Sequence, residues 1–121
     1  MPRRRSFSKT SQTYLATSAA RTTSGNGSAT TSLEWAQVAK LDVTARSGTT
    51  PSLTVVIEES PNGSTGWATR ASFTAQTATG TQIIALPRLN HAFLRATWTI
   101  SGTTPSFTFS VQVANGDSAL L

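Results

Sequence analysis

The sequence predicts an all-β protein: a β-sandwich or jelly-roll-like fold of about six to eight short antiparallel strands, with an extended N-terminal arm. Two observations support this. Only 12% of the 121 residues are charged, and Thr, Ser, Gly and Ala take their place. Thr is β-branched and suits a pleated, half-exposed surface. In addition, segments of strand length with a period of two alternate with turn signals, and no long stretch has the helical period.

The chain divides into three expected parts. Residues 1–32 form a basic, Ser/Thr-rich N-terminal arm that ends in a hinge, TTSGNGSATTS at 22–32. Residues 33–115 form the sandwich domain, and residues 116–121 form a C-terminal tail. A length of 121 residues is typical of one domain.

Alternating apolar residues mark the expected strands of the sandwich domain. They lie at 33–45, 53–60, 70–75, 81–86, 93–100 and 106–114. Between the second and the third, Asn62-Gly63 predicts a type I′ hairpin turn or a related tight loop. The expected core residues are Trp35, Phe73, Phe93, Trp98, Phe107 and Phe109.

One hexapeptide, SGTTPS, occurs twice, at 47–52 and at 101–106. Each copy is expected to be a turn between two strands, so the repeat predicts two similar hairpins, packed face to face around a pseudo-twofold axis. The strands that follow the two copies match in parity, whereas those that precede them do not. A β-bulge in one copy would explain the mismatch, because one extra residue reverses the faces of a strand. The alternative is that a good turn sequence is used twice.

The net charge of +5 is concentrated at the N-terminal end. Residues 1–21 hold five basic residues and no acidic one, whereas the rest of the chain holds five of each sign. A neutral body exerts little diffuse electrostatic attraction, so the arm is expected to decide which charged partner is bound.

Eight residues of the arm are the expected partner-binding residues. They are the basic residues Arg3, Arg4, Arg5, Lys9 and Arg21 and the apolar residues Phe7, Tyr14 and Leu15. The basic side chains would pair with carboxylates or phosphates, and the apolar ones would anchor the arm on its partner. The alternative is a solvated, disordered tail, because a segment of this composition cannot bury enough surface to fold alone.

The sequence lacks the parts of an enzyme, and we expect no catalytic, cofactor-binding or metal-binding residues. It has no cysteine and a single histidine, His91, which excludes the usual zinc ligand sets. Glu58 and Glu59 are adjacent on an expected strand and point to opposite faces, so they do not form a general acid–base pair. Glu59 has the parity of the buried residues and is expected at the strand end. No P-loop, dinucleotide-binding or nucleophile-elbow motif is present.

No segment has the length and hydrophobicity of a membrane span, so no membrane is expected as a partner. The first twenty residues also lack the apolar run of a secretory signal, and we expect the protein to fold in the cytoplasm of the cell that makes it.

Three segments together, SGTTPSLTVVIEESPNGSTGW, TATGTQ and FLRATWTISGTTPSFTFSVQV, resemble small β-rich virion structural proteins of tailed bacteriophages and prophages. The resemblance covers about residues 33–114 and is greatest to capsid decoration (cement) proteins. It implies a non-enzymatic homotrimer that stabilises the shell by binding the major capsid protein, with the arm as a clamp. The implied location is the capsid surface of the virion, after assembly in the host cytoplasm. The arm itself matches no fixed motif of the family.

Three other functions remain open at this point. A tail component would share the virion location. A carbohydrate-binding or adhesion module would need exposed aromatic side chains in a concave patch, for which Trp67 and Tyr14 are the candidates. Nucleic-acid binding would use the positive charges of the arm to neutralise phosphates, although the body lacks a basic face.

Overall fold

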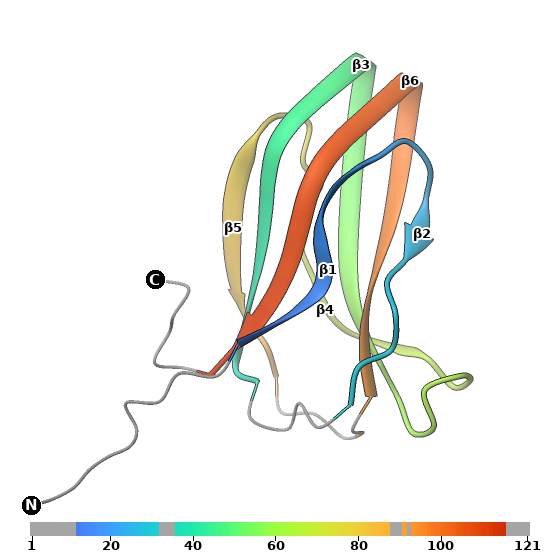
Figure 1. Ribbon diagram of the computed structural model, residues 1–121, viewed down its shortest axis with the longest axis vertical. Helices are drawn as coiled ribbons and strands as arrows, with labels where there is room; N and C mark the ends of the chain where they lie inside the picture. The colour runs from blue at the N-terminus through green and yellow to red at the C-terminus, as the bar shows by residue number, and fades with distance from the viewer. Residues whose placement is uncertain (1–11, 32–35, 88–90, 92, 116–121) are drawn as a thin grey trace, which may run out of the picture.

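The computed structural model describes residues 12–31, 36–87, 91 and 93–115, and it is all-β, as predicted. The strands are β1 (Gln12–Arg21), β2 (Gly25–Asn26), β3 (Val38–Ser60), β4 (Ala68–Ser72), β5 (Gly80–Ala85) and β6 (Phe93–Ala114). They belong to one antiparallel sheet, which folds over on itself to form a sandwich (Figure 1). Two strands are not short: β3 has 23 residues and β6 has 22.

Each long strand passes through both layers of the sandwich, and each layer therefore holds half of β3 and half of β6. Layer 1 consists of β1, β5, residues 38–47 of β3 and residues 106–114 of β6. Layer 2 consists of β2, β4, residues 52–60 of β3 and residues 93–101 of β6. The order across layer 1 is β1-β6-β3-β5, and the order across layer 2 is β2-β6-β3-β4.

The two SGTTPS segments form the corner where the sheet passes from one layer to the other, at the top of Figure 1. The expectation of two separate hairpin turns is wrong, since each copy is a bend inside one continuous strand and the two copies lie side by side, with Thr49 opposite Thr103. The bends need positive φ angles, at Gly48 (111°) and Thr50 in β3 and at Gly102 (120°) and Thr104 in β6. These matching angles place the copies about the predicted pseudo-twofold axis.

A β-bulge in β3, before its SGTTPS copy, explains the parity mismatch between the strands that precede the two copies. Val43 lies opposite Phe109 and Ala45 lies opposite Thr108, so Thr44 is the extra residue in β3. The strand reverses its faces at this point, because side chains alternate with a period of two. Val43 is consequently buried and Ala45 is exposed, although they share one parity.

The duplication includes more of the chain than the hexapeptide. β1, β2 and β3 form one repeat, and β4, β5 and β6 form a second in the same order. Every strand pairing joins the two repeats: β1, β2 and β3 all pair with β6, while β4, β5 and β6 all pair with β3. The sandwich is therefore built from two interlocked three-stranded units.

The core lies between the layers and follows the alternation of the long strands. Phe107, Phe109, Leu41, Leu53 and Ile57 are fully buried. Burying side chains of this size contributes about 1.5–3 kcal/mol each. Of the other expected core residues, Phe73 and Trp98 are buried, Phe93 is partly buried, and Trp35 lies outside the described residues.

Residues 12–31, which were expected in the arm and hinge, lie on the sheet. β1 forms an edge of layer 1, β2 pairs with β6, and Thr30 forms a bridge with Leu94. The alternating residues Leu15 and Tyr14 let β1 bury one face while the other stays exposed. Residues 1–11 and 32 of the expected arm and hinge lie outside the described part of the chain.

The loop between the repeats is a tight loop, but its turn is not type I′. Gly63 has a φ of 79°, while Asn62 does not have the positive φ that a type I′ turn needs at both positions. The Asn62 side chain accepts hydrogen bonds from the backbone N–H groups of Ser64 and Thr65. The Ser60 hydroxyl accepts from the backbone N–H of Gly63. Side-chain hydrogen bonds therefore hold the loop between β3 and β4.

Candidate functional site

Of the eight predicted partner-binding residues, the structure places three. Tyr14, Leu15 and Arg21 lie on β1, whereas Arg3, Arg4, Arg5, Phe7 and Lys9 lie outside the described residues. The Tyr14 side chain is 51% exposed and is free to contact a partner. Leu15 is buried in the core, so it anchors β1 to the sandwich.

Arg21 is also engaged within the fold. Its guanidinium lies 4.6 Å from the ring centres of both Trp98 and Phe109. It donates hydrogen bonds to the backbone carbonyls of Phe109 and Thr17. Burial lowers the pKa of Arg21, because the charged group loses hydration. The side chain lies at the edge of the sandwich between β1 and β2, where it packs against the core.

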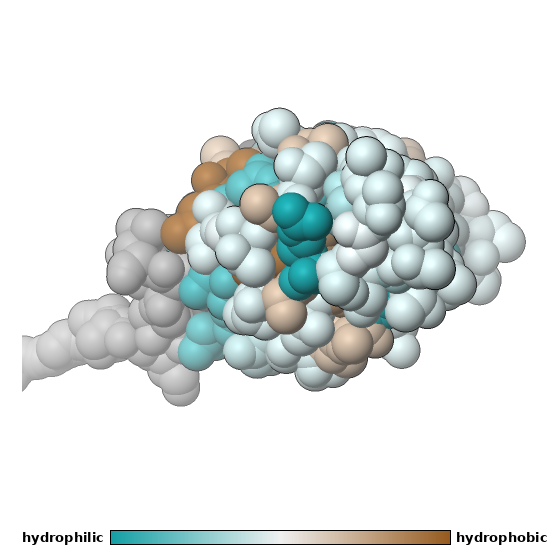
Figure 2. Space-filling model, turned by 90° about the horizontal axis from the view of Figure 1, so that it is seen from above, coloured by the Kyte–Doolittle hydropathy of each residue, from teal (hydrophilic) through white to brown (hydrophobic). Residues whose placement is uncertain are grey.

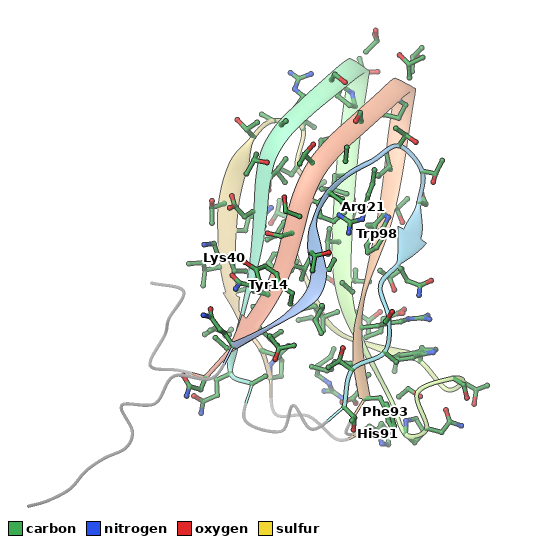
Figure 3. All side chains as sticks on the ribbon, viewed as in Figure 1. Tyr14, Arg21, Lys40, His91, Phe93 and Trp98 are labelled. Carbon is green, nitrogen blue, oxygen red and sulfur yellow. The ribbon has the colours of Figure 1, made fainter. Side chains whose placement is uncertain are left out.

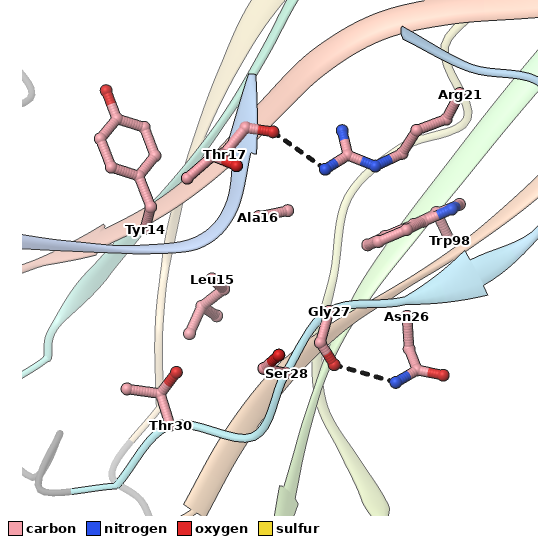
Figure 4. Close-up of a pocket in the computed structure, with 10 residues that line it drawn as sticks. All are labelled: Tyr14, Leu15, Ala16, Thr17, Arg21, Asn26, Gly27, Ser28, Thr30 and Trp98. Carbon is pink, nitrogen blue, oxygen red and sulfur yellow. Dashed lines mark hydrogen bonds between the residues drawn. The ribbon is translucent and has the colours of Figure 1, made fainter. Parts of the chain in front are cut away.

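A groove of about 480 Å³ runs along that edge, between β1 and the segment that contains β2 (Figure 4). Its lining residues are Tyr14, Leu15, Ala16, Thr17, Arg21, Asn26, Gly27, Ser28, Thr30 and Trp98. The Asn26 amide is bound to the Gly27 carbonyl, and Arg21 is bound to Thr17. Figure 4 shows the Tyr14 ring on the opposite side of β1 from Leu15. The groove is thus lined by a mixture of apolar and small polar residues, and the Arg21 and Asn26 side chains are hydrogen-bonded within it.

The outer face of layer 1 carries a row of four side chains from four strands. Tyr14 of β1 lies opposite Gln112 of β6, Gln112 lies opposite Lys40 of β3, and Lys40 lies opposite Ile83 of β5. Most of their neighbours in the strands are buried apolar residues, so these four point outward. We call Tyr14, Gln112, Lys40 and Ile83 the outer row. Figure 3 shows Tyr14 and Lys40 on this side of the sandwich.

The outer row holds both large hydrophobic side chains that are exposed among the described residues. Tyr14 is 51% exposed and Ile83 is 40% exposed. Figure 2, a view onto the corner of the sandwich, shows a mostly pale surface with hydrophobic side chains gathered on the side where β5 lies. Tyr14 was predicted from the sequence, but the other three residues of the row were not. The alternation at 38–43 and 81–86 indicates which residues point outward, but the pairing of β3 with both β5 and β6 is needed to bring them together.

The outer face of layer 2 is different, because its charges are paired with each other. The Arg95 Nε donates to Glu58 Oε1 at 2.8 Å, and the Thr97 hydroxyl donates to the same oxygen at 2.8 Å. The guanidinium of Arg95 also lies 4.1 Å from the ring centre of Trp67. Trp67 and Tyr14, the two aromatics expected for a carbohydrate patch, therefore belong to opposite layers and do not form one surface.

Glu59 is buried at the end of β3, as predicted, and forms an ion pair with Arg70 of β4. The backbone N–H of His91 donates to Glu59 at 3.3 Å. Glu58 and Glu59 thus lie on opposite faces, each with a different arginine. Across the described ranges, no three His, Cys, Asp or Glu side chains gather as metal ligands would. The same ranges include no helix that could span a membrane.

Comparison with known proteins gives no family for this chain. No family model matches it, and no curated protein matches it significantly.

Proposed function

We propose that this protein is a non-enzymatic structural protein of a bacteriophage virion, which decorates the capsid and stabilises it by binding the major capsid protein. The combination of a sandwich body with a basic N-terminal segment supports the proposal most. The body is a doubly interlocked sandwich, and residues 1–11 join it at the edge of the exposed outer row.

The distribution of charge supports a binding role for the terminus. In the body, Arg21, Arg70 and Arg95 are engaged by carbonyls, rings or carboxylates. Residues 1–11 contain four basic residues and no acid. A basic segment without acidic residues is suited to contact with an acidic surface of a shell that is already assembled.

A trimer, placed where capsid subunits meet, would hold three such segments and gain avidity from them. The proposed location is the capsid surface. A tail component remains the alternative within the virion, because the same framework and basic segment would serve there.

Immunogold electron microscopy tests this proposal. Particles purified on a density gradient from the source culture are labelled with an antibody against the recombinant protein. Label on the heads supports decoration, and label on the tails supports the tail alternative. The absence of label on particles, while the antibody detects the protein in the soluble fraction, would exclude a virion function.

A further inference from the structure

We infer that the outer row of layer 1 is the docking face of this protein, and that its partner is an acidic protein surface. This inference rests on the proposed function and deepens it, since it names the surface that would meet the shell. It commits to one of the two outer faces of the sandwich and to one kind of partner.

The pseudo-twofold axis makes the two outer faces of the sandwich equivalent, but their side chains differ. In layer 2, Glu58 and Arg95 satisfy each other and Trp67 covers the guanidinium. The outer row, which is the equivalent part of layer 1, leaves Tyr14 and Ile83 exposed. Lone apolar side chains on a surface are common, but these two share one row across four strands. Tyr is enriched among the residues that contribute most to binding at protein interfaces, and Gln112 and Lys40 can supply polar contacts beside it.

The chain of residues 1–11 continues into Gln12, which lies beside the outer row. Gln12, the first described residue, accepts a hydrogen bond from the Gln112 amide of the outer row at 3.2 Å. Residues 1–11 therefore leave the sandwich beside this row. A fully extended segment of this length spans up to roughly 35 Å, so it can contact the partner that lies on the face.

The charged residues on and beside the outer row also indicate the kind of partner. Lys40 stands in the middle of the row and makes no ion pair within the described ranges. The Asp42 carboxylate, next on the same face, accepts a hydrogen bond from Thr81 at 3.1 Å. Four further positive charges lie in residues 1–11, without an acid. Lys40 and Asp42 balance each other on the face, so the excess positive charge beside it is that of residues 1–11, and this excess is complementary to an acidic surface.

The test measures binding of the purified full-length protein to capsids from a phage that lacks its coding sequence, by co-sedimentation. Tyr14→Ser with Ile83→Thr should weaken binding about tenfold or more, because both anchors are lost. Lys40→Glu should weaken it about fivefold, and more at low salt. The matched controls are Val56→Thr, an apolar-to-hydroxyl change on the outer face of layer 2, and Arg46→Glu, an equal charge change at the exposed corner. Both should bind like the wild type, and circular dichroism should show that all variants fold.

The outcomes separate this inference from the proposed function. Failure of the wild-type protein to bind capsids would contradict the proposed function. Binding of the wild type with equal binding of the outer-row variants would overturn the docking face. Light scattering that shows loss of a wild-type oligomer in those variants would assign the face to a second copy of the chain and overturn the acidic partner. Displacement by excess double-stranded DNA would also overturn it.

Discussion

The corner glycines offer the sharpest test of the folded sheet. A Cβ atom at Gly48 would lie 2.7 Å from the Thr104 carbonyl oxygen, and one at Gly102 would lie 2.8 Å from the Thr50 carbonyl oxygen. Both glycines have φ angles that other residues rarely adopt, 111° and 120°. Substitution by alanine therefore combines backbone strain of about 1–3 kcal/mol with a clash against main-chain atoms.

We expect Gly48→Ala and Gly102→Ala each to lower the free energy of unfolding by about 2–4 kcal/mol, and by the same amount within about 1 kcal/mol. For a domain of this size, that loss lowers the melting temperature by about 8–16 °C. Urea unfolding followed by circular dichroism measures the free energy, and a thermal melt measures the shift.

Gly66→Ala is the control. Its φ is 70°, but a Cβ there would meet only the Pro61 ring at an ordinary 3.4 Å. We expect a loss of about 1–2 kcal/mol from backbone strain alone. Unequal effects at Gly48 and Gly102, or effects no larger than that of Gly66→Ala, would refute the argument that the two SGTTPS copies are structural equivalents.

Three further predictions concern the core, the buried ion pair and the repeats. Phe107→Ala should destabilise the fold by about 3–5 kcal/mol in the same urea assay, because a fully buried ring leaves a cavity; a loss below 1 kcal/mol would contradict its place in the core. Glu59→Ala should cost about 2–3 kcal/mol, since Arg70 keeps its charge in a site that is mostly buried, and a neutral effect would show that water replaces the carboxylate. The fragments 1–63 and 64–121 should each lack β structure alone and recover it when mixed, as circular dichroism can detect, because all strand pairings join the two repeats; a folded single fragment would disprove interlocking.

The sequence allowed prediction of the fold class, the bulge and most of the core, because those depend on local alternation. The parity of Leu41 and Val43 against Leu94 and Ala96 suggested a bulge in one of the two strands that precede the corner. That bulge lies at Thr44.

The corner itself was mispredicted, and the reason is physical. Ser-Gly-Thr-Thr-Pro satisfies the rules for a turn, and a bend between two layers uses the same positive φ angles as a turn within one sheet. Only the pairing of Thr49 with Thr103 distinguishes them, and this contact is remote in sequence.

The candidate site was predictable only in part. Arg21 was predicted as a basic partner-binding residue and Tyr14 as an apolar anchor of the same segment. Whether a basic side chain packs within the fold or contacts a partner depends on the residues around it. Arg21 lies against Trp98 and Phe109, which are far away in sequence. The outer row depends on four strands meeting, which no local pattern predicts.

The interlocking of the repeats has a consequence for synthesis. While the ribosome is still translating β6, β1 and β2 have no strand to pair with, since their partner is β6, and β3 can pair only with β4 and β5. The apolar faces of the first repeat stay exposed until Ala114 has emerged, and the core then closes through contacts that are mostly distant in sequence. Folding through distant contacts is slow. Unpaired strands of nascent chains on neighbouring ribosomes can therefore pair with each other. We expect the cell's chaperones to bind this protein before its fold is complete.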